Sequence, residues 1–252
     1  MHQCIVDNQY TLDQIYNFDE TRFEWEVKSR FTYDFYGTDR VLGCSSNAIN
    51  HALTVMLMVR ADGTKLPALI IFKERTRNIP ERTKRLLKIP TNVMVKSNKS
   101  GYISQDILTQ YLLLELRRNE KLIIIDKCST HTTPDLMRLY KDINANIKII
   151  PGGCTKYLQP LDATVINSFK RRTHKERIST MMQNIDRRTK AGNIKRPTRQ
   201  NLINWVSSAW DNTDYEIVQR SFKITGAYNP NESTDSLLLR HQLPMRRILL
   251  ED

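Results

Sequence analysis

The stretch KLIIIDKCSTH, residues 121–131, is the part of the chain around which the rest is organised. Its four consecutive branched aliphatic residues, 122–125, are bounded by charge, and such a short apolar run is typical of a strand covered on both faces. Asp126 follows directly. A carboxylate placed where a buried strand enters a polar loop is held rigidly and still reaches solvent, as a catalytic or metal-binding carboxylate must. The alternative is that Asp126 only starts a turn or caps the next helix.

Two further aspartates stand in comparable positions. Residues 14–18 (QIYNF) form a β-prone run that is expected to end at Asp19. Asp162 opens a stretch, residues 162–185, that is helical in character and contains neither proline nor glycine, although an aspartate there is also explained by the helix dipole. Three carboxylates on neighbouring strand ends and one helix start would form a cage for Mg²⁺ or Mn²⁺, which prefer carboxylate oxygens.

The remaining apolar runs predict a mixed sheet. Residues 52–59 and 66–72 are joined through Asp62-Gly63, a strong hairpin signal that predicts two adjacent antiparallel strands. A short strand is expected at 93–95 and a buried one at 147–150. The alternation of strand, helix and strand between 122 and 150 has the pattern of a βαβ crossover and therefore of a parallel pair.

Besides the helical stretch at 162–185, four helices are expected around these strands. One follows Ser104, which has the character of an N-cap, and another follows Thr133-Pro134, an N-cap and a helix-opening proline. Two more are expected at residues 199–210 and 214–223, the second capped by Thr213 and closed by Gly226. Trp205 and Trp210 are interpreted as packing residues.

The composition points to a nucleic-acid partner. The chain has 252 residues, 40% of them apolar, which suits one large domain with a full core, and its formal net charge of +12 favours a polyanion. Residues 73–88 are dense in lysine and arginine and suit either a phosphate-contacting surface or a solvated loop. The basic residues expected to contact DNA are Lys73, Arg75, Arg77, Lys127, Lys170 and Arg171.

Other classes of protein are disfavoured. The four cysteines, Cys4, Cys44, Cys128 and Cys154, form no C-x-x-C pair, which argues against a zinc site or a disulfide framework and favours a reducing compartment. The sequence has no apolar run near the roughly 18 residues of a membrane span and no signal-peptide pattern at 1–10. An intracellular protein is therefore expected.

Three blocks of the sequence carry a resemblance to a known family. These are IYNFDET (15–21), LIIIDKCSTH (122–131) and IIPGGCTKYLQPLDATVINSFK (149–170). They resemble the three acidic blocks of the DDE superfamily endonucleases, in particular the pogo/Tigger/jerky-like transposases. In order and context, Asp19, Asp126 and Asp162 match the metal-binding aspartates of that family. Residues 66–73 and the C-terminal WVSSAW…SFKITGAYNP are similar too, so the resemblance covers about residues 10–230.

This resemblance implies both a fold and an activity. The fold would be α/β, an RNase H-like mixed sheet flanked by helices with a C-terminal helical extension, formed by residues 10–230 and followed by a tail at 231–252. Two Mg²⁺ or Mn²⁺ ions, held by Asp19, Asp126 and Asp162 as catalytic ligands, would support cleavage and transfer of DNA strands. Such a protein would act on DNA in the nucleus, and a homodimer is compatible with that activity.

The chain also departs from the family pattern. Lys127 stands where the family usually has Asn, and Arg22 where it commonly has Gly. The family carries helix-turn-helix domains ahead of the catalytic domain, and none precedes Asp19 in this sequence, so DNA binding is expected to be electrostatic and weakly sequence-specific. The alternative function is that of a domesticated or decaying transposon remnant that binds DNA or a partner without catalysis.

A different class of enzyme is also conceivable from the same loop. Ser129 and His131 would be the nucleophile and base of a serine hydrolase, but no nucleophile-elbow glycine pattern surrounds Ser129, which disfavours this reading. His131 is instead interpreted as a neighbour of the metal ligands or as a surface residue, ahead of a role as a metal ligand.

Overall fold

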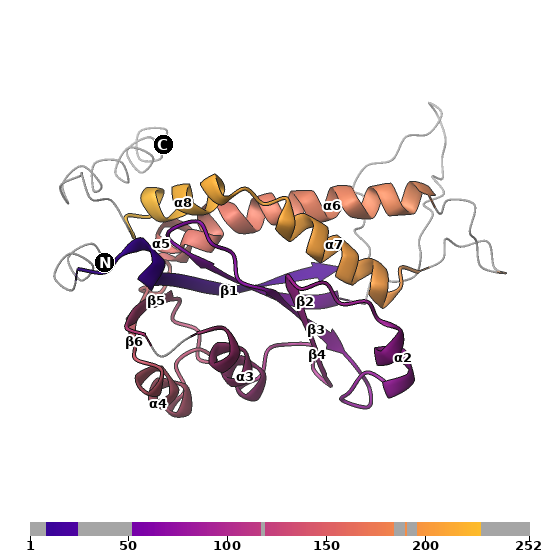
Figure 1. The fold of residues 1–252 in the computed structure, drawn as a ribbon, viewed down its shortest axis with the longest axis horizontal. Helices are drawn as coiled ribbons and strands as arrows, with labels where there is room; N and C mark the ends of the chain where they lie inside the picture. The colour runs from indigo at the N-terminus through magenta and orange to yellow at the C-terminus, as the bar shows by residue number, and fades with distance from the viewer. Residues whose placement is uncertain (1–8, 25–51, 117–118, 184–189, 191–195, 228–252) are drawn as a thin grey trace, which may run out of the picture.

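A six-stranded mixed sheet forms the centre of the protein, and helices lie on both of its sides (Figure 1). The computed structural model describes residues 9–24, 52–116, 119–183, 190 and 196–227. The strand order is β4-β3-β2-β1-β5-β6. The strands are β1 (Ile15–Glu24), β2 (Ala52–Arg60), β3 (Ala68–Lys73), β4 (Val93–Asn98), β5 (Lys121–Ile125) and β6 (Ala145–Ile149). This arrangement confirms the expected RNase H-like α/β sheet.

Strand β5 is buried along its whole length, as its apolar run predicts. It pairs in parallel with β1 on one side and with β6 on the other, so the predicted parallel crossover is confirmed. The neighbouring prediction of a buried strand at 147–150 is wrong in two respects. Strand β6 begins at Ala145, and it stands at the end of the strand order, which leaves Ile149 40% exposed. An edge strand has a pairing partner on one side only, and its side chains are correspondingly less covered.

The hairpin of β2 and β3 is antiparallel, as Asp62-Gly63 predicts. Gly63 has a φ of +97°, a conformation that glycine adopts without the steric cost that a Cβ imposes. The amide of Gly63 donates to the carbonyl of Arg60 at 3.0 Å, which closes the turn. Strand β3 begins at Ala68, two residues later than expected, directly after Pro67, which has no amide hydrogen to give to a ladder.

Strand β1 is longer than expected, and this changes the position of Asp19. The sequence predicted a short strand that ends at this aspartate, whereas β1 runs from Ile15 to Glu24. Strand β2 pairs with it antiparallel from Tyr16 to Glu24, so the ladder continues past the apolar part of the strand. Asp19 therefore lies in the middle of a central strand and not at its end.

Helices cover the sheet in two layers. Figure 1 shows α3 and α4 on one side and α6, α7 and α8 on the other. The elements are the 3₁₀ turn η1 (Leu12–Gln14), α2 (Glu81–Leu86), α3 (Gln105–Glu115), α4 (Pro134–Asp142), α5 (Thr155–Leu158), the π-helical turn η2 (Leu161–Val165), α6 (Ile166–Gln183), α7 (Arg199–Asp211) and α8 (Tyr215–Ile224). Each layer packs its own hydrophobic cluster against the sheet.

The predicted helix caps are confirmed, except for the N-cap of the last helix. The side chains of Ser104 and Thr133 accept hydrogen bonds from the amides three residues on and so cap α3 and α4. Helix α8 is preceded by Asp214 as its N-cap, one residue after the expected Thr213. The expected C-terminal glycine is present, because Gly226 has a φ of +67° and donates its amide to Lys223 at 3.2 Å.

Both tryptophans predicted to pack are buried. Trp210 is 1% exposed and meets Phe169 of α6 edge-on, and Trp205 is 5% exposed. The predicted tail from residue 231 and most of the basic stretch around residues 187–196 lie outside the described residues. Among the helices that the structure describes, none combines the length and the apolar character that crossing a membrane requires.

Candidate active site

The three aspartates come from three elements that meet at one end of β5. Asp19 lies on β1, Asp126 follows the last residue of β5, and Asp162 is the second residue of η2. In the parallel pairing of β1 and β5, Ile15 is opposite Leu122 and each following pair advances by one residue. Continuation of this register brings Asp19 and Asp126 to the same level. π-helical turns are rare and often occur at functional sites.

Asn17 joins the three elements that carry the aspartates. Its side chain is fully buried, and its Nδ2 donates to the carbonyl of Ile124 at 2.8 Å. Its Oδ1 accepts the amide of Leu161 at 2.9 Å. Asn17 thus fixes β1, β5 and η2 within two residues of each aspartate. Sequence analysis missed this residue, although a polar side chain inside an otherwise apolar run is a signal that could have found it.

The three carboxylates are electrostatically coupled. Burial raises the pKa of Asp19 to about 8, and repulsion from Asp162 and, more weakly, from Glu20 and Asp126 contributes. The Glu20 amide, which donates to Oδ1 of Asp19 at 2.8 Å, has the opposite, lowering effect on this pKa. Burial also raises the pKa of Asp162, as does the charge of Asp126. The structure therefore brings all three predicted residues together. Like charges in a partly dry site disfavour ionisation, which a bound cation would reverse.

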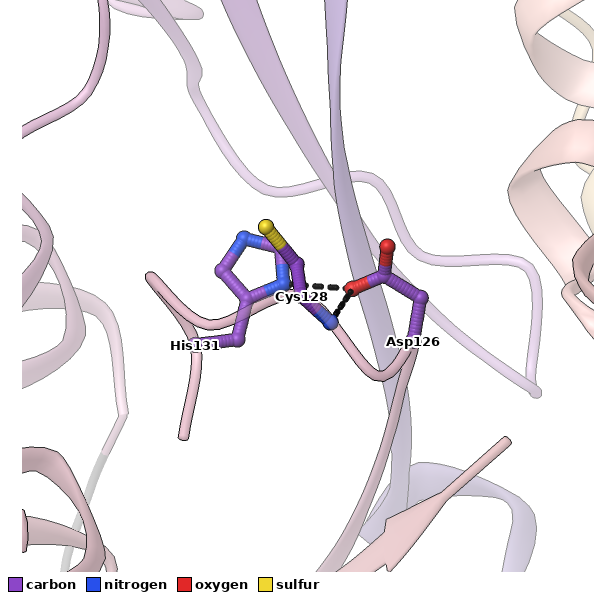
Figure 2. A group of neighbouring side chains, drawn as sticks. All are labelled: Asp126, Cys128 and His131. Atoms are coloured by element: carbon purple, nitrogen blue, oxygen red, sulfur yellow. Dashed lines mark hydrogen bonds and ion pairs between the residues drawn. The ribbon is translucent and has the colours of Figure 1, made fainter. Parts of the chain in front are cut away.

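Asp126 is held by its own loop. Its Oδ1 accepts the amide of Cys128 at 3.2 Å and lies 2.7 Å from Nδ1 of His131. Figure 2 shows both interactions at one carboxylate oxygen, while the other oxygen points away. The bond to the amide two residues on is a turn of the kind that the alternative interpretation of Asp126 proposed. The same carboxylate is both part of a turn and part of the acidic cluster.

His131 bridges two carboxylates and is not a surface residue. It is 1% exposed, and its Nε2 lies 3.2 Å from Oε1 of Glu20. Burial alone would lower its pKa, but the hydrogen bonds and charges of Glu20 and Asp126 raise the pKa to about 9. Because both ring nitrogens face carboxylates, neither faces Ser129, and the arrangement gives no support to a serine hydrolase. Sequence analysis did not single out Glu20 as part of this site.

The basic residues predicted to contact DNA fall into two groups, and all are exposed. Lys127 follows Asp126 in the chain, and Lys170 on α6 is close enough to lower the pKa of Asp162. Arg171 is the next residue of α6. The second group lies where β3 ends and leads towards α2, away from these loops in sequence. Its members are Lys73, Arg75 and Arg77.

A cavity of about 350 Å³ lies between β1, α6 and α7. Lys170 lines it and so links it to Asp162. Arg22, which stands where the resemblance led us to expect glycine, lines it as well, and so do His174 and Trp205. Arg22 and Lys73 also share a smaller hollow. Cationic side chains of β1 and α6 thus line the cavity, and Lys170 among them acts on Asp162.

Comparison with known proteins agrees with this geometry. The human "Pogo transposable element with KRAB domain" is 28% identical to this chain over 246 residues, which are 94% of this chain and 39% of the relative. The chain therefore spans about two fifths of the length of this curated relative. Two solved structures share the fold at low identity. They are a pre-cleavage Mos1 transpososome (TM-score 0.56, 10% identity, 90% of this chain and 56% of that chain) and a Mos1 mariner paired end complex with Mn (TM-score 0.54, 12% identity, 89% and 56%).

A family model identifies the protein family of the chain. The model described as "DDE superfamily endonuclease" matches residues 50–222, well over half of the chain. Two of the three coupled aspartates, Asp126 and Asp162, lie within the matched residues, and the third reaches them through β1. The match and the fold point in the same direction, and the chain belongs to the DDE superfamily endonucleases.

Proposed function

We propose that residues 10–230 form a catalytic domain that cleaves DNA strands and transfers them with the help of divalent metal ions. Asp19, Asp126 and Asp162 would hold two Mg²⁺ or Mn²⁺ ions. The single observation that carries this proposal is that the buried Asn17 ties β1, β5 and η2 together within two residues of Asp19, Asp126 and Asp162. The curated relative is named as a transposable element, and a solved neighbour is a complex with Mn, which supports the same assignment.

The donor set fits hard divalent cations. All three groups offer carboxylate oxygens, which Mg²⁺ and Mn²⁺ prefer. The raised pKa of Asp19 reflects burial together with neighbouring negative charge, so the cluster favours a positive charge of external origin. When bound, such ions activate a nucleophilic oxygen and neutralise the charge that develops on a transferring phosphate.

The residues of the chain would prepare the site for that chemistry. Asn17 would keep β1, β5 and η2 in register, so that the three carboxylates stay in place during the reaction. His131 would hold Oδ1 of Asp126 and leave the other oxygen for an ion. Positioning of this kind contributes directly to rate, because a misplacement of about 1 Å costs on the order of 10²-fold.

DNA would approach through the basic residues. Lys127, Lys170 and Arg171 would contact phosphates beside the acidic cluster, and the side chains at the end of β3 would extend the contact. Binding should be mostly electrostatic, so affinity should fall steeply between about 50 and 200 mM salt. Equal affinity at both salt concentrations would contradict this surface. The proposal places the protein in the nucleus and is compatible with a homodimer.

The test is nicking of supercoiled DNA in the presence of Mn²⁺, with the wild type compared with Asp126→Asn. The variant keeps the side-chain volume and the turn, but loses one charge and one ligand. We expect it to fold and to lose on the order of 10²-fold or more of the metal-dependent cleavage, the scale seen when a main electrostatic stabiliser is removed. Asp142→Asn, an exposed aspartate of α4, is the matched control and should retain activity.

The same experiment addresses the alternative function. A remnant that binds DNA without catalysis would retain DNA in a binding assay and show no nicking in the wild type. Nicking that persists undiminished in Asp126→Asn would remove this carboxylate from the site. The melting temperature with and without Mn²⁺ separates the outcomes further, because an ion held by Asp126 should stabilise the wild type more than the variant.

A further inference from the structure

The loop after β5 holds a second set of donor atoms. One oxygen of Asp126, Sγ of Cys128 and a ring nitrogen of His131 all lie within 4.8 Å of one another (Figure 2). The loop is closed by two backbone contacts: the Cys128 amide donates to Asp126 Oδ1 at 3.2 Å, and the His131 amide donates to the Cys128 carbonyl at 3.0 Å. The three side chains therefore converge because of the local fold of six residues.

This donor set differs in kind from the three aspartates. It offers one oxygen, one sulfur and one imidazole nitrogen. This combination suits Zn²⁺ and similar transition-metal ions and does not suit Mg²⁺. Three protein ligands with water in the fourth position are a common arrangement for an accessible zinc ion. Cys128 and Asp126 are half-buried, so the site can be reached from solvent.

Two further contacts prepare the ligands. Nε2 of His131 lies 3.2 Å from Glu20, and a carboxylate at the far nitrogen is the usual way in which a metal-binding histidine is oriented. Oγ1 of Thr130 lies 3.0 Å from Sγ of Cys128, within reach to donate to a thiolate. Glu20 would thus orient His131, and Thr130 would support the sulfur of Cys128.

We propose that Asp126, Cys128 and His131 form a binding site for Zn²⁺, and that zinc bound there inhibits the enzyme by occupying the carboxylate of Asp126. Zinc would replace the proton between Nδ1 of His131 and Oδ1 of Asp126 and the proton of the Cys128 thiol, and both would be released to solvent. The binding itself does not depend on the function proposed above, whereas the inhibition rests on it.

Binding is tested with Co²⁺ as a spectroscopic substitute for Zn²⁺ on the full chain. We expect a thiolate-to-cobalt charge-transfer band that saturates at one ion per chain and that Zn²⁺ abolishes by displacement. Cys128→Ser should lose the band, and Cys154→Ser, the other cysteine in the described part of the chain, should keep it. A band that survives in Cys128→Ser, or that disappears in Cys154→Ser, would overturn the site.

A second variant tests the orienting contact. Glu20→Gln keeps the three ligands but weakens the acceptor for Nε2, and we expect Co²⁺ affinity to fall about 10- to 100-fold, as for other partners of metal-bound histidines. Unchanged affinity in Glu20→Gln would show that Glu20 does not prepare His131 as a ligand. Circular dichroism of each variant confirms that it is folded.

Inhibition is measured as the Zn²⁺ concentration that halves Mn²⁺-dependent nicking, with each variant normalised to its own activity without Zn²⁺. Cys128→Ser should need at least about tenfold more Zn²⁺ than Cys154→Ser. Equal inhibition of both would mean that zinc acts at the three aspartates instead, and the inhibitory role would be withdrawn. Absence of nicking in the wild type would count against the proposed function only, because the Co²⁺ band is measured without any reaction.

Discussion

Asp19 and Glu20 are consecutive residues of β1 and belong to two different halves of the site. Side chains of a strand alternate between its faces. Among the neighbouring side chains, Asp162 of η2 repels the Asp19 carboxylate most strongly, whereas Glu20 contacts His131 on the side of α4. The side chains that act on the Asp19 carboxylate are all acidic. Glu20 and Asp126, in contrast, share an imidazole that can carry a proton between them.

This difference indicates where the proposed divalent cations would offset negative charge that the protein itself does not offset. In the half formed by Asp126, His131 and Glu20, the protonated imidazole offsets the two carboxylates as long as no metal displaces its proton, and the result is a rigid support. In the half formed by Asp19 and Asp162, the negative charge is only partly offset by Lys170, and burial makes it costly. In the proposed site, two consecutive carboxylates of β1 would thus have different roles, Asp19 in cation binding and Glu20 in positioning.

The largest effect is expected when the two neighbouring carboxylates, Asp19 and Glu20, are neutralised one at a time. Asp19→Asn should reduce metal-dependent nicking by about 10²- to 10³-fold, because it removes a proposed ligand of the transition-state ions. Glu20→Gln should reduce it by less than about tenfold, because Glu20 acts through His131. Rates of plasmid nicking under Mn²⁺ saturation measure both. Equal losses would erase the distinction between the two halves.

The next largest effect is expected on stability, in the half of the site formed by Asp126, His131 and Glu20. His131→Ala leaves Glu20 and Asp126 without the group between them and opens a cavity, and we expect a loss of about 2–4 kcal/mol in the free energy of unfolding. Denaturant titration provides the measurement. His174→Ala, an exposed histidine of α6, serves as the control and should cost less than about 1 kcal/mol. A cost as small as that of the control would show that the bridge contributes no stability.

In the half formed by Asp19 and Asp162, removal of a charged side chain should stabilise the protein instead of destabilising it. The folded state holds the Asp19 proton up to about pH 8, whereas the unfolded chain releases it near 3.8, so stability falls as pH rises through this window. Without added metal, Asp19→Asn should therefore stabilise the protein by about 1–3 kcal/mol at pH 8, well below the full shift at 1.36 kcal/mol per pKa unit. The gain should disappear near pH 4. Melting curves at the two pH values check this, and a destabilised variant at pH 8 would contradict it.

The smallest effect is expected at Lys170. Lys170→Gln removes a cation that lowers the pKa of Asp162, so Mn²⁺ should bind about two- to threefold more tightly while DNA binds more weakly, with a salt slope reduced by about one. Isothermal titration with Mn²⁺ and anisotropy with labelled DNA measure the two. Arg171→Gln, the next residue of α6, should weaken DNA binding without the gain in Mn²⁺ affinity. Weaker Mn²⁺ binding in Lys170→Gln would show that the Lys170 ammonium does not act on Asp162 as proposed.

Much of the local structure was determined by the sequence alone. The buried run before Asp126, the Asp62-Gly63 turn and the caps at Ser104 and Thr133 depend on residues that lie within a few positions of one another. Apolar periodicity and capping are local in this sense, so they can be read without knowing the fold. The three acidic blocks and their order likewise identified the aspartates that the structure brings together.

Only the tertiary structure decided how those aspartates are held. The side chain of Asn17 reaches Ile124 and Leu161, which are 107 and 144 residues away in the chain, and Glu20 reaches His131 across 111 residues. Such contacts depend on strand order and register. The same is true of the length of β1, which pairing with β2 extends beyond its apolar part, and of the raised pKa of Asp19, which arises from burial and from charges that the fold brings close. Sequence encodes these properties through the packing of distant elements, and no short stretch contains them.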